Sequence, residues 1–172
     1  SLDFYGAVSI DTDSDGDIYI LSDYSGLTVT KFSSLGVFEV ASSINCTIPQ
    51  SGCTFIPTPL QIKVDNNDDI LFSFKRISGG FIDLDPSSNI VTIPSNSSQF
   101  MLVKWSNNLD SLLWFNFVTG TQPVQGTAQG GIDVTPEAMY FDIDSNNKIY
   151  LASIYNYAIS LSRYSQNGSL LN

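Results

Sequence analysis

The sequence contains no histidine among its 172 residues. Histidine is the commonest general base in enzymes and the commonest transition-metal ligand in proteins. Its absence excludes most hydrolase triads and most zinc sites. Any catalysis or metal binding by this chain has to rest on carboxylates and hydroxyls.

Basic residues and long hydrophobic runs are also scarce. Seven Lys and Arg stand against 17 Asp and Glu, which gives a net charge of −10. Such a charge repels both a phosphate backbone and an anionic membrane surface. The longest apolar stretches, such as SLLWFNFV at 111–118, fall short of the roughly 18 residues that span a bilayer. We therefore expect a soluble chain with neither a nucleic-acid partner nor a membrane insertion.

Apolar and neutral polar residues are plentiful. Hydrophobic residues make up 42% of the chain and aromatic residues 12%, which is enough for a packed core. Only 14% of residues are charged, and solubility depends mostly on Ser, Asn and Thr. This composition is common in secreted and cell-surface β proteins, so we expect an extracellular or cell-surface location.

Two features agree with that location. Cys46 and Cys53 flank a segment with Pro49 and Gly52, which favours a reversing loop and predicts a disulfide; the alternative is two free buried thiols. Closing so short a loop contributes at most about 3 kcal/mol. Three Asn-X-Ser/Thr patterns in turn-like contexts predict a glycoprotein. Their acceptors are Asn45, Asn96 and Asn167.

Three segments align without gaps and indicate an internal repeat. They are SIDTDSDGDIYIL (9–21), QIKVDNNDDILFS (61–73) and YFDIDSNNKIYLA (140–152). Each is followed by a basic residue, an aromatic residue, a serine and a polar turn, in TKFSSLG (30–36), VKWSNNL (103–109) and SRYSQNG (162–168). The second copy carries an insertion of about twenty residues between the two anchors.

Each repeat reads as four antiparallel strands. Residues alternate between apolar and polar, strand formers dominate, and Gly, Asn, Asp and Ser collect in between. We predict first strands at 6–12, 60–65 and 138–143, second strands from the shared isoleucine, and third strands ending at the basic and aromatic pair. Fourth strands are expected at 37–44 and 111–118. No stretch has a helical period, so the predicted fold class is all-β.

Tandem four-stranded units of this size are typical of β-propeller blades. We predict three: 1–58 with the cysteine loop, 59–134 with the insertion, and 135–172, whose fourth strand is incomplete. Three units do not close a ring of four to eight blades. The chain is then either a piece of a larger propeller or a subunit whose copies complete one another, as a ring or a filament.

The repeat resembles the bacterial SBBP-type β-propeller repeats of secreted proteins. The second copy resembles them most, in GGFIDLDPSSNIVTI (79–93) and FMLVKWSNNLDSLLWFNF (100–117). The resemblance implies a propeller fold and no particular activity. Glycines that the family has at left-handed turn positions are replaced by Asp68, Leu109 and Asn147, and we expect these turns to survive, since Asn and Asp tolerate that conformation better than most residues.

The first repeat also carries a candidate calcium loop. Asp11, Asp13, Asp15 and Asp17, with Gly16, fit the first half of a D-x-D-x-D-G loop, in which alternate carboxylates converge on the cation. The bidentate acid expected at its twelfth position is missing. The two sister turns lack the acidic ladder, so the alternative is an Asx-type turn, in which the aspartate accepts backbone N–H groups. No other cofactor is expected.

The sequence names no ligand, and we expect no catalysis. The first hypothesis is a non-catalytic module for adhesion, scaffolding or binding of a protein or glycan. The second is a structural subunit of an extracellular filament or surface layer. A remote third is a glycoside hydrolase, which needs two facing carboxylates; the candidates are Asp83, Asp85, Asp133 and Glu137. Exposed tyrosines would suit a glycan platform, with blade packing as the alternative; these are Tyr24, Tyr140, Tyr155 and Tyr157.

Overall fold

The computed structural model describes residues 6–23, 26–46, 56–77, 82–93, 99–118, 138–155 and 158–171. Every regular element in these ranges is a β-strand, and none is a helix. The predicted all-β class is therefore confirmed. Since these ranges contain no helix, they also contain none long and apolar enough to cross a membrane.

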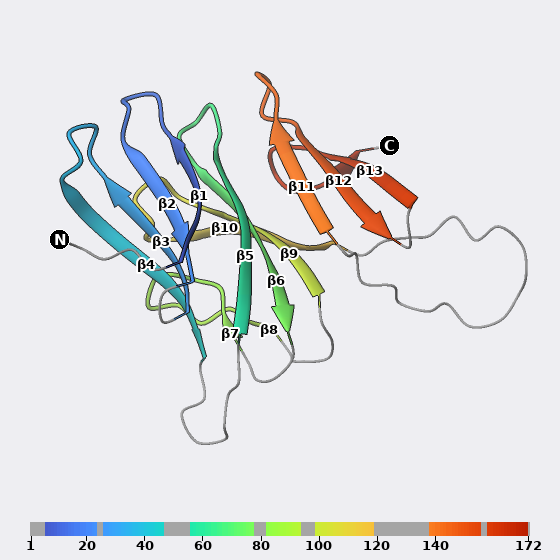
Figure 1. Cartoon of the computed structure of the whole chain (residues 1–172), viewed down its shortest axis with the longest axis horizontal. Coiled ribbons are helices and arrows are strands. Elements are labelled where there is room, and N and C mark those ends of the chain that lie inside the picture. Colours follow the sequence, from blue (N-terminus) through green and yellow to red (C-terminus); the bar gives the residue numbers. More distant parts are fainter. Residues whose placement is uncertain are drawn as a thin grey trace, which may run out of the picture.

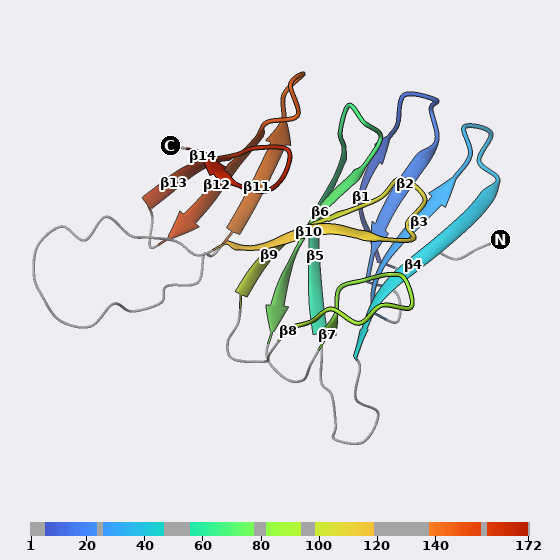
Figure 2. The same ribbon diagram turned by 180° about the vertical axis from the view of Figure 1, so that it is seen from behind.

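The strands form three antiparallel sheets, shown from opposite sides in Figures 1 and 2. The first sheet contains β1 (Ala7–Thr12), β2 (Ile18–Ser22), β3 (Leu27–Phe32) and β4 (Phe38–Cys46). The second contains β5 (Ile56–Val64), β6 (Ile70–Ile77), β9 (Gln99–Trp105) and β10 (Leu112–Val118). The third contains β11 (Ala138–Ile143), β12 (Ile149–Tyr155), β13 (Ala158–Tyr164) and β14 (Leu170–Leu171). Each of these sheets is open, and none closes on itself.

The predicted strands agree closely with the observed ones. The second strands β2, β6 and β12 begin at Ile18, Ile70 and Ile149, the shared isoleucines of the repeat. The third strands β3, β9 and β13 end at the shared aromatic residues, Phe32, Trp105 and Tyr164. Alternating apolar residues bounded by turn formers thus predicted where the second strands begin and where the third strands end.

The insertion of the second repeat pairs with the first sheet. Its residues 82–93 lie within the predicted second unit, 59–134, whose bounds stay a prediction. In the structure, β7 (Ile82–Asp83) and β8 (Thr92–Ile93) form a short hairpin, and β7 pairs antiparallel with β4 of the first sheet. An edge strand such as β4 offers unpaired backbone N–H and C=O groups, and β7 of the hairpin pairs with some of them.

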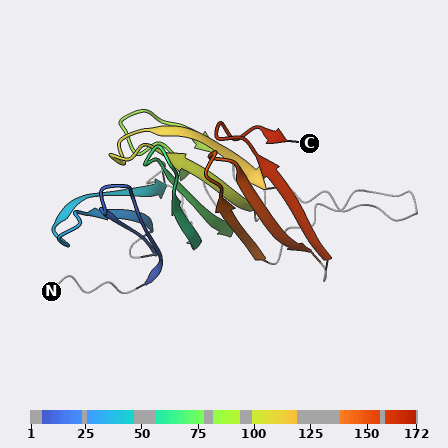
Figure 3. The same ribbon diagram turned by 90° about the horizontal axis from the view of Figure 1, so that it is seen from above.

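The three sheets lie side by side in chain order, which is clearest from above in Figure 3. Their first strands β1, β5 and β11 are neighbours (Figure 1). We call the face of a sheet that is directed toward the next sheet along the chain its front face, and the opposite face its back face. Side chains of a strand alternate between the two faces.

The core consists of two apolar layers, each between a front face and the following back face. The first layer joins Tyr19 and Val29 of the first sheet to Ile62, Ile70 and Phe72 of the second. The second layer joins front-face residues of the second sheet to the back face of the third. Its members are Leu71, Phe100, Leu102, Val118, Met139, Phe141, Ile149 and Leu151. The sheets are therefore held together mainly by burial of apolar surface.

Candidate functional site

The second aspartate of the candidate calcium loop, Asp13, caps its own turn. Asp13 Oδ1 accepts hydrogen bonds from the backbone N–H groups of Asp15, at 3.1 Å, and Asp17, at 2.8 Å. Its second oxygen accepts from the hydroxyl of Tyr19, at 3.1 Å. Both oxygens of this carboxylate are thus occupied by donors from the protein.

The two sister turns repeat this geometry. Asp65 Oδ1 accepts from Asn67 N and Asp69 N, and Asp144 Oδ1 from Asn146 N and Lys148 N, all between 2.8 and 3.1 Å. The fourth residue of each turn is left-handed, with φ of 81° at Gly16, 63° at Asp68 and 57° at Asn147. Leu109 is left-handed too, with φ of 57°. The Asx-type turn is confirmed, and the turns survive their glycine replacements as expected.

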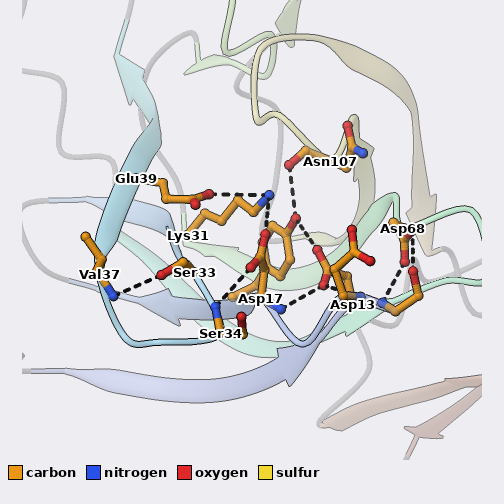
Figure 4. A network of polar contacts seen from close by, with 12 residues as sticks. Asp13, Asp17, Lys31, Ser33, Ser34, Val37, Glu39, Asp68 and Asn107 are labelled. Atoms are coloured by element: carbon orange, nitrogen blue, oxygen red, sulfur yellow. Dashed lines mark hydrogen bonds and ion pairs between the residues drawn. The ribbon is translucent and has the colours of Figure 1, made fainter.

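Asp17 belongs to an ion-pair network (Figure 4). Lys31 Nζ lies 2.9 Å from Asp17 Oδ2 and 3.5 Å from Glu39, and Asp17 Oδ1 accepts the backbone N–H of Ser34. The hydrogen bond from Lys31 holds the pKa of Asp17 below its usual value. Burial raises the pKa of Tyr19 to about 12, an effect that the nearby carboxylate of Asp13 reinforces.

The remaining two aspartates of the loop point to different surroundings. Asp11 Oδ2 accepts the backbone N–H of Val64, in β5, at 2.9 Å. Asp15 is exposed, and its carboxylate makes no hydrogen bond or ion pair with the described residues. Across these residues no three carboxylate, histidine or cysteine side chains gather as a metal-ion site. The geometry of Asp11, Asp13, Asp15 and Asp17 favours the turn, and calcium binding there stays a prediction.

The left-handed residues of the Asp turns join neighbouring sheets. The carboxylate of Asp68 accepts both the backbone N–H and the hydroxyl of Ser14, each at 2.9 Å (Figure 4). At the next junction Asn147 Oδ1 accepts the backbone N–H of Asn66 at 2.9 Å and its side-chain amide at 2.8 Å. Ser14 and Asn66 hold the same position in the repeat. The side chain at the position that Gly16 holds in the first repeat thus serves as a clamp between sheets.

The first strands are joined by side chains at a second repeated position. Ser9 Oγ accepts the backbone N–H of Ile62, at 3.1 Å. Gln61, at the position of Ser9, accepts the backbone N–H of Phe141 at 3.0 Å and donates to its carbonyl at 2.8 Å. Each of these links connects β1 to β5 or β5 to β11, and so sets the order of the sheets.

The fourth strands supply a third repeated link. Ser42 in β4 donates to the carbonyl of Leu109 at 2.7 Å, and Asn116 in β10, at the same repeat position, donates to the carbonyl of Gly168. Gly168 also needs to be glycine, because a Cβ there would lie 2.9 Å from Trp114 and Asn116. The turns that follow β9 and β13, each of which begins with a serine, are therefore hydrogen-bonded directly to the fourth strand of the preceding sheet.

Sequence reasoning identified the turns and missed the links between them. The linked residues lie 52 to 81 positions apart, and a pairing at that distance has no local signature. One signal was present in the sequence: the position of Gly16 is occupied in the other two repeats by Asp68 and Asn147, whose side chains carry hydrogen-bond acceptors. A structural role between copies of the repeat is one reason to keep an acceptor there.

We expect the clamp at Asp68 to be measurable. Asp68→Ala loses two hydrogen bonds and strains a left-handed position, so it should lower the free energy of unfolding by about 1–3 kcal/mol in a urea titration. Asp68→Asn keeps an acceptor, as Asn147 does, and should remain within about 0.5 kcal/mol of the natural protein. Equal losses in the two variants would contradict a clamp made by the side-chain oxygen.

Stability is expected to fall in acid. Hydrogen bonds from Lys31 to Asp17, and from the backbone N–H of Lys148 to Asp144, lower the pKa of both carboxyls below their ordinary 3.8. A lowered pKa means that the unfolded chain binds protons first, so the stabilisation is present above pH 3.8 and is lost as the pH falls through the lower folded values. Denaturant titrations at a series of acidic pH values measure this loss.

Two variants identify the source of the acid response. Asp144→Asn removes one of the carboxyls whose pKa is lowered in the folded chain and should flatten the decline of stability with falling pH. Asp15→Asn removes an exposed carboxylate without contacts and should leave the decline as it is. An unchanged profile for Asp144→Asn would contradict the assignment.

The cysteine and glycosylation candidates lie only partly within the described residues. Cys46 ends β4, but Cys53 lies outside the described residues, so the disulfide stays a prediction. Asn167 is exposed in the turn before β14, Asn45 lies in β4 rather than in a turn, and Asn96 is outside the described residues.

The carboxylates considered for glycoside hydrolysis organise a turn. Asp83 Oδ1 accepts Asp85 N and Val91 N, and Asp85 Oδ1 accepts Ser87 N. Asp133 and Glu137 lie outside the described residues, as do Tyr24 and Tyr157, and the side chain of Tyr155 is not described. Tyr140 is exposed on the third sheet.

An open apolar hollow lies on the front face of the third sheet. Its volume is about 270 Å³, and Tyr140, Asp142, Tyr150 and Leu161 are among the residues that line it. Few polar groups converge there, in contrast to the usual small-molecule site. A larger hollow of about 490 Å³ adjoins it, and Tyr150, Leu161 and Leu170 are among the residues that line this second hollow.

Comparison of the sequence with protein-family models and with curated proteins finds no match. The fold and the contacts above are therefore the basis for a functional assignment.

Proposed function

We propose that the three sheets are blades of a β-propeller related to the bacterial SBBP-type repeats, and that the chain is a non-catalytic extracellular module for adhesion or scaffolding that binds a protein or a glycan. One observation carries the proposal: the polar side chains of the repeat hold sheet to sheet, at equivalent positions, at both junctions. Side chains at these repeat positions therefore favour the stacking of each sheet on the next.

The arrangement of the sheets supports the propeller. Blades are four-stranded antiparallel sheets placed side by side around an axis, with their first strands innermost. Here the three sheets follow one another in chain order with β1, β5 and β11 as neighbours (Figure 3). The front face of each sheet packs on the back face of the next, as it does between blades.

The use of the carboxylates supports a module without catalysis. Glycoside hydrolysis needs a pair of carboxyl groups that face each other across a cleft. Asp13, Asp65, Asp144 and Asp83 instead accept backbone N–H groups of their own turns. The extracellular location rests on the cysteine pair, the Asn-X-Ser/Thr patterns and the composition.

Binding and turnover measurements test this function. The labelled chain is expected to bind saturably to a member of a glycan array or to an extracellular protein, and to release no product from chromogenic glycosides. Hydrolysis that disappears in the Asp83→Asn/Asp85→Asn variant would replace the module with an enzyme. Hydrolysis that persists in this variant would indicate another carboxylate pair and would equally overturn the proposal.

A second function, a structural subunit of an extracellular filament or surface layer, is favoured by one specific observation. The front face of the third sheet and the back face of the first are the outer faces of the stack, and both expose apolar side chains. An apolar face without a partner in a repeat protein is a place where stacking continues.

A further inference from the structure

The front face of the third sheet is the uncovered copy of a surface that is buried twice elsewhere in this chain. Leu161 is 80% exposed, whereas Val29 and Leu102, at the same repeat position, are fully buried under the following sheet. Ile159 is 72% exposed, and its counterparts in the first two sheets are buried. The apolar character of this face is therefore explained by a function in stacking.

The back face of the first sheet is uncovered in the complementary way. Ile10 is 63% exposed, while Ile62 and Phe141 at the same repeat position are buried by the preceding sheet. A Cβ at Gly36 would meet no atom within 4 Å, while its counterpart Gly168 is covered by side chains of the second sheet. The first sheet thus has the shape of a following sheet whose back face is left uncovered by the described residues.

Polar groups on the two faces also match the links seen inside the chain. Asp142 occupies the position of Asp11, which accepts the backbone N–H of Val64. The counterpart of Val64 in the first sheet is Thr12, on the edge strand β1. An Asp142 carboxylate against a Thr12 N–H would reproduce the contact between Asp11 and Val64.

A tyrosine gives a second match. The single hydroxyl hydrogen of Tyr19 is shared between Asp13 Oδ2 and the carbonyl of Asn107, which follows the serine of the next repeat's turn (Figure 4). Tyr150 occupies the position of Tyr19 and is 46% exposed on the front face of the third sheet. The counterpart of Asn107 in the first repeat is Ser34. A Tyr150 hydroxyl directed at the Ser34 carbonyl would repeat the internal contact.

We propose that two copies of this chain associate head to tail, with the front face of the third sheet of one copy packed on the back face of the first sheet of the other. The occupant is a second copy because its first sheet offers, at equivalent positions, the apolar and polar groups that this face receives twice within the chain. The interface rests on the proposed function, in which the sheets are stacking blades. It uses face-to-face packing rather than exchange of a strand.

This junction is expected to be weaker than the internal ones. The clamp of the Asp turns needs an acceptor side chain on the following sheet, supplied by Asp68 and Asn147 inside the chain. The first repeat has Gly16 there, so Ser145, at the position of Ser14 and Asn66, finds no acceptor. Association between copies is therefore concentration-dependent, and it yields a closed ring or an open series depending on the rotation between sheets.

Sedimentation of the purified chain over a range of concentrations tests the interface. The expected mass is that of two copies or a higher multiple, decreasing toward one copy on dilution. Leu161→Asp on the front face and Ile10→Asp on the back face should each abolish the assembly, because each buries a carboxylate in an apolar layer. Ile90→Asp, a change at an equally exposed apolar residue in the turn between β7 and β8, is the matched control and should assemble normally.

Mixing the two variants tests the head-to-tail orientation. The Ile10→Asp chain keeps its front face and the Leu161→Asp chain keeps its back face, so an equal mixture should form a one-to-one pair that grows no further. Circular dichroism establishes that each variant is folded, and Ile159→Asp replaces Leu161→Asp if the latter is not. A monomer at every concentration, or an Ile10→Asp chain that still dimerises, would overturn the interface.

Failure of this interface is distinguishable from failure of the proposed function. A monomeric chain in which Gln61→Ala still lowers stability keeps its stacked sheets and loses only the association between copies. A monomer that binds a glycan through the hollow beside Tyr140 would assign the uncovered face to that ligand and overturn the interface.

Discussion

Replacing Lys104 with methionine is expected to lower the free energy of unfolding by about 3–5 kcal/mol. The ammonium of Lys104 lies 2.7 Å from Asp65 and 2.9 Å from Asp69, and both Lys104 and Asp65 are buried. Without the lysine, the buried carboxylate of Asp65 and the carboxylate of Asp69 lose the cation that both of them contact. Asp65 also caps the turn between β5 and β6, so its displacement would disturb the centre of the molecule.

A urea titration followed by circular dichroism measures the effect. Lys63→Met is the matched control, because Lys63, whose side chain is 35% exposed, makes an ion pair at 3.3 Å with the largely exposed Asp142. Pairs of that kind contribute about 0–1 kcal/mol. Equal losses in the two variants would mean that the pair at Lys104 is screened as a surface pair is.

Trp105→Ala is the second large effect, with an expected loss of about 3–5 kcal/mol. Trp105 is fully buried on the back face of the second sheet, and its ring meets Phe72 edge to face at 4.8 Å. Its indole N–H donates to the carbonyl of Leu84, at 2.8 Å. The substitution removes this packing and leaves a buried carbonyl without its donor.

Two further tryptophan variants separate these contributions. Trp105→Phe keeps part of the packing and loses the hydrogen bond, so its loss should be smaller than that of Trp105→Ala. Trp114→Ala affects a partly exposed indole that donates to Gln166, and should cost less than Trp105→Ala as well. If Trp114→Ala is the more harmful change, the principal core lies between the second and third sheets rather than between the first and second.

The strands and turns could be predicted because their causes are local. Alternation of apolar and polar residues located β2, β6 and β12 to their first residue, and an aspartate two to four residues before its N–H partners specified the Asx turns. The left-handed positions at Asp68 and Asn147 followed from their alignment with Gly16. Interactions within five residues leave a recognisable pattern in the sequence.

The placement of the insertion could not be predicted in the same way. Residues 82–93 contain two short apolar segments around a polar turn, and the sequence contains nothing that chooses between two sheet edges. Pairing with β4 is decided by which edge is free and near once the sheets have packed. The same holds for the calcium hypothesis, since four alternating aspartates specify a ladder of acids but not where each carboxylate points.

By itself, the sequence determined that this protein is built from β-strands, that the strands come in repeats, and where each repeat turns. The tertiary structure alone decided how the repeats are joined: Asp11 to Val64, Ser14 to Asp68, Gln61 to Phe141. The physical reason is how far apart the interacting residues lie along the chain. A turn is stabilised by neighbours in the chain, whereas a link between sheets exists only after packing brings together residues more than fifty positions apart.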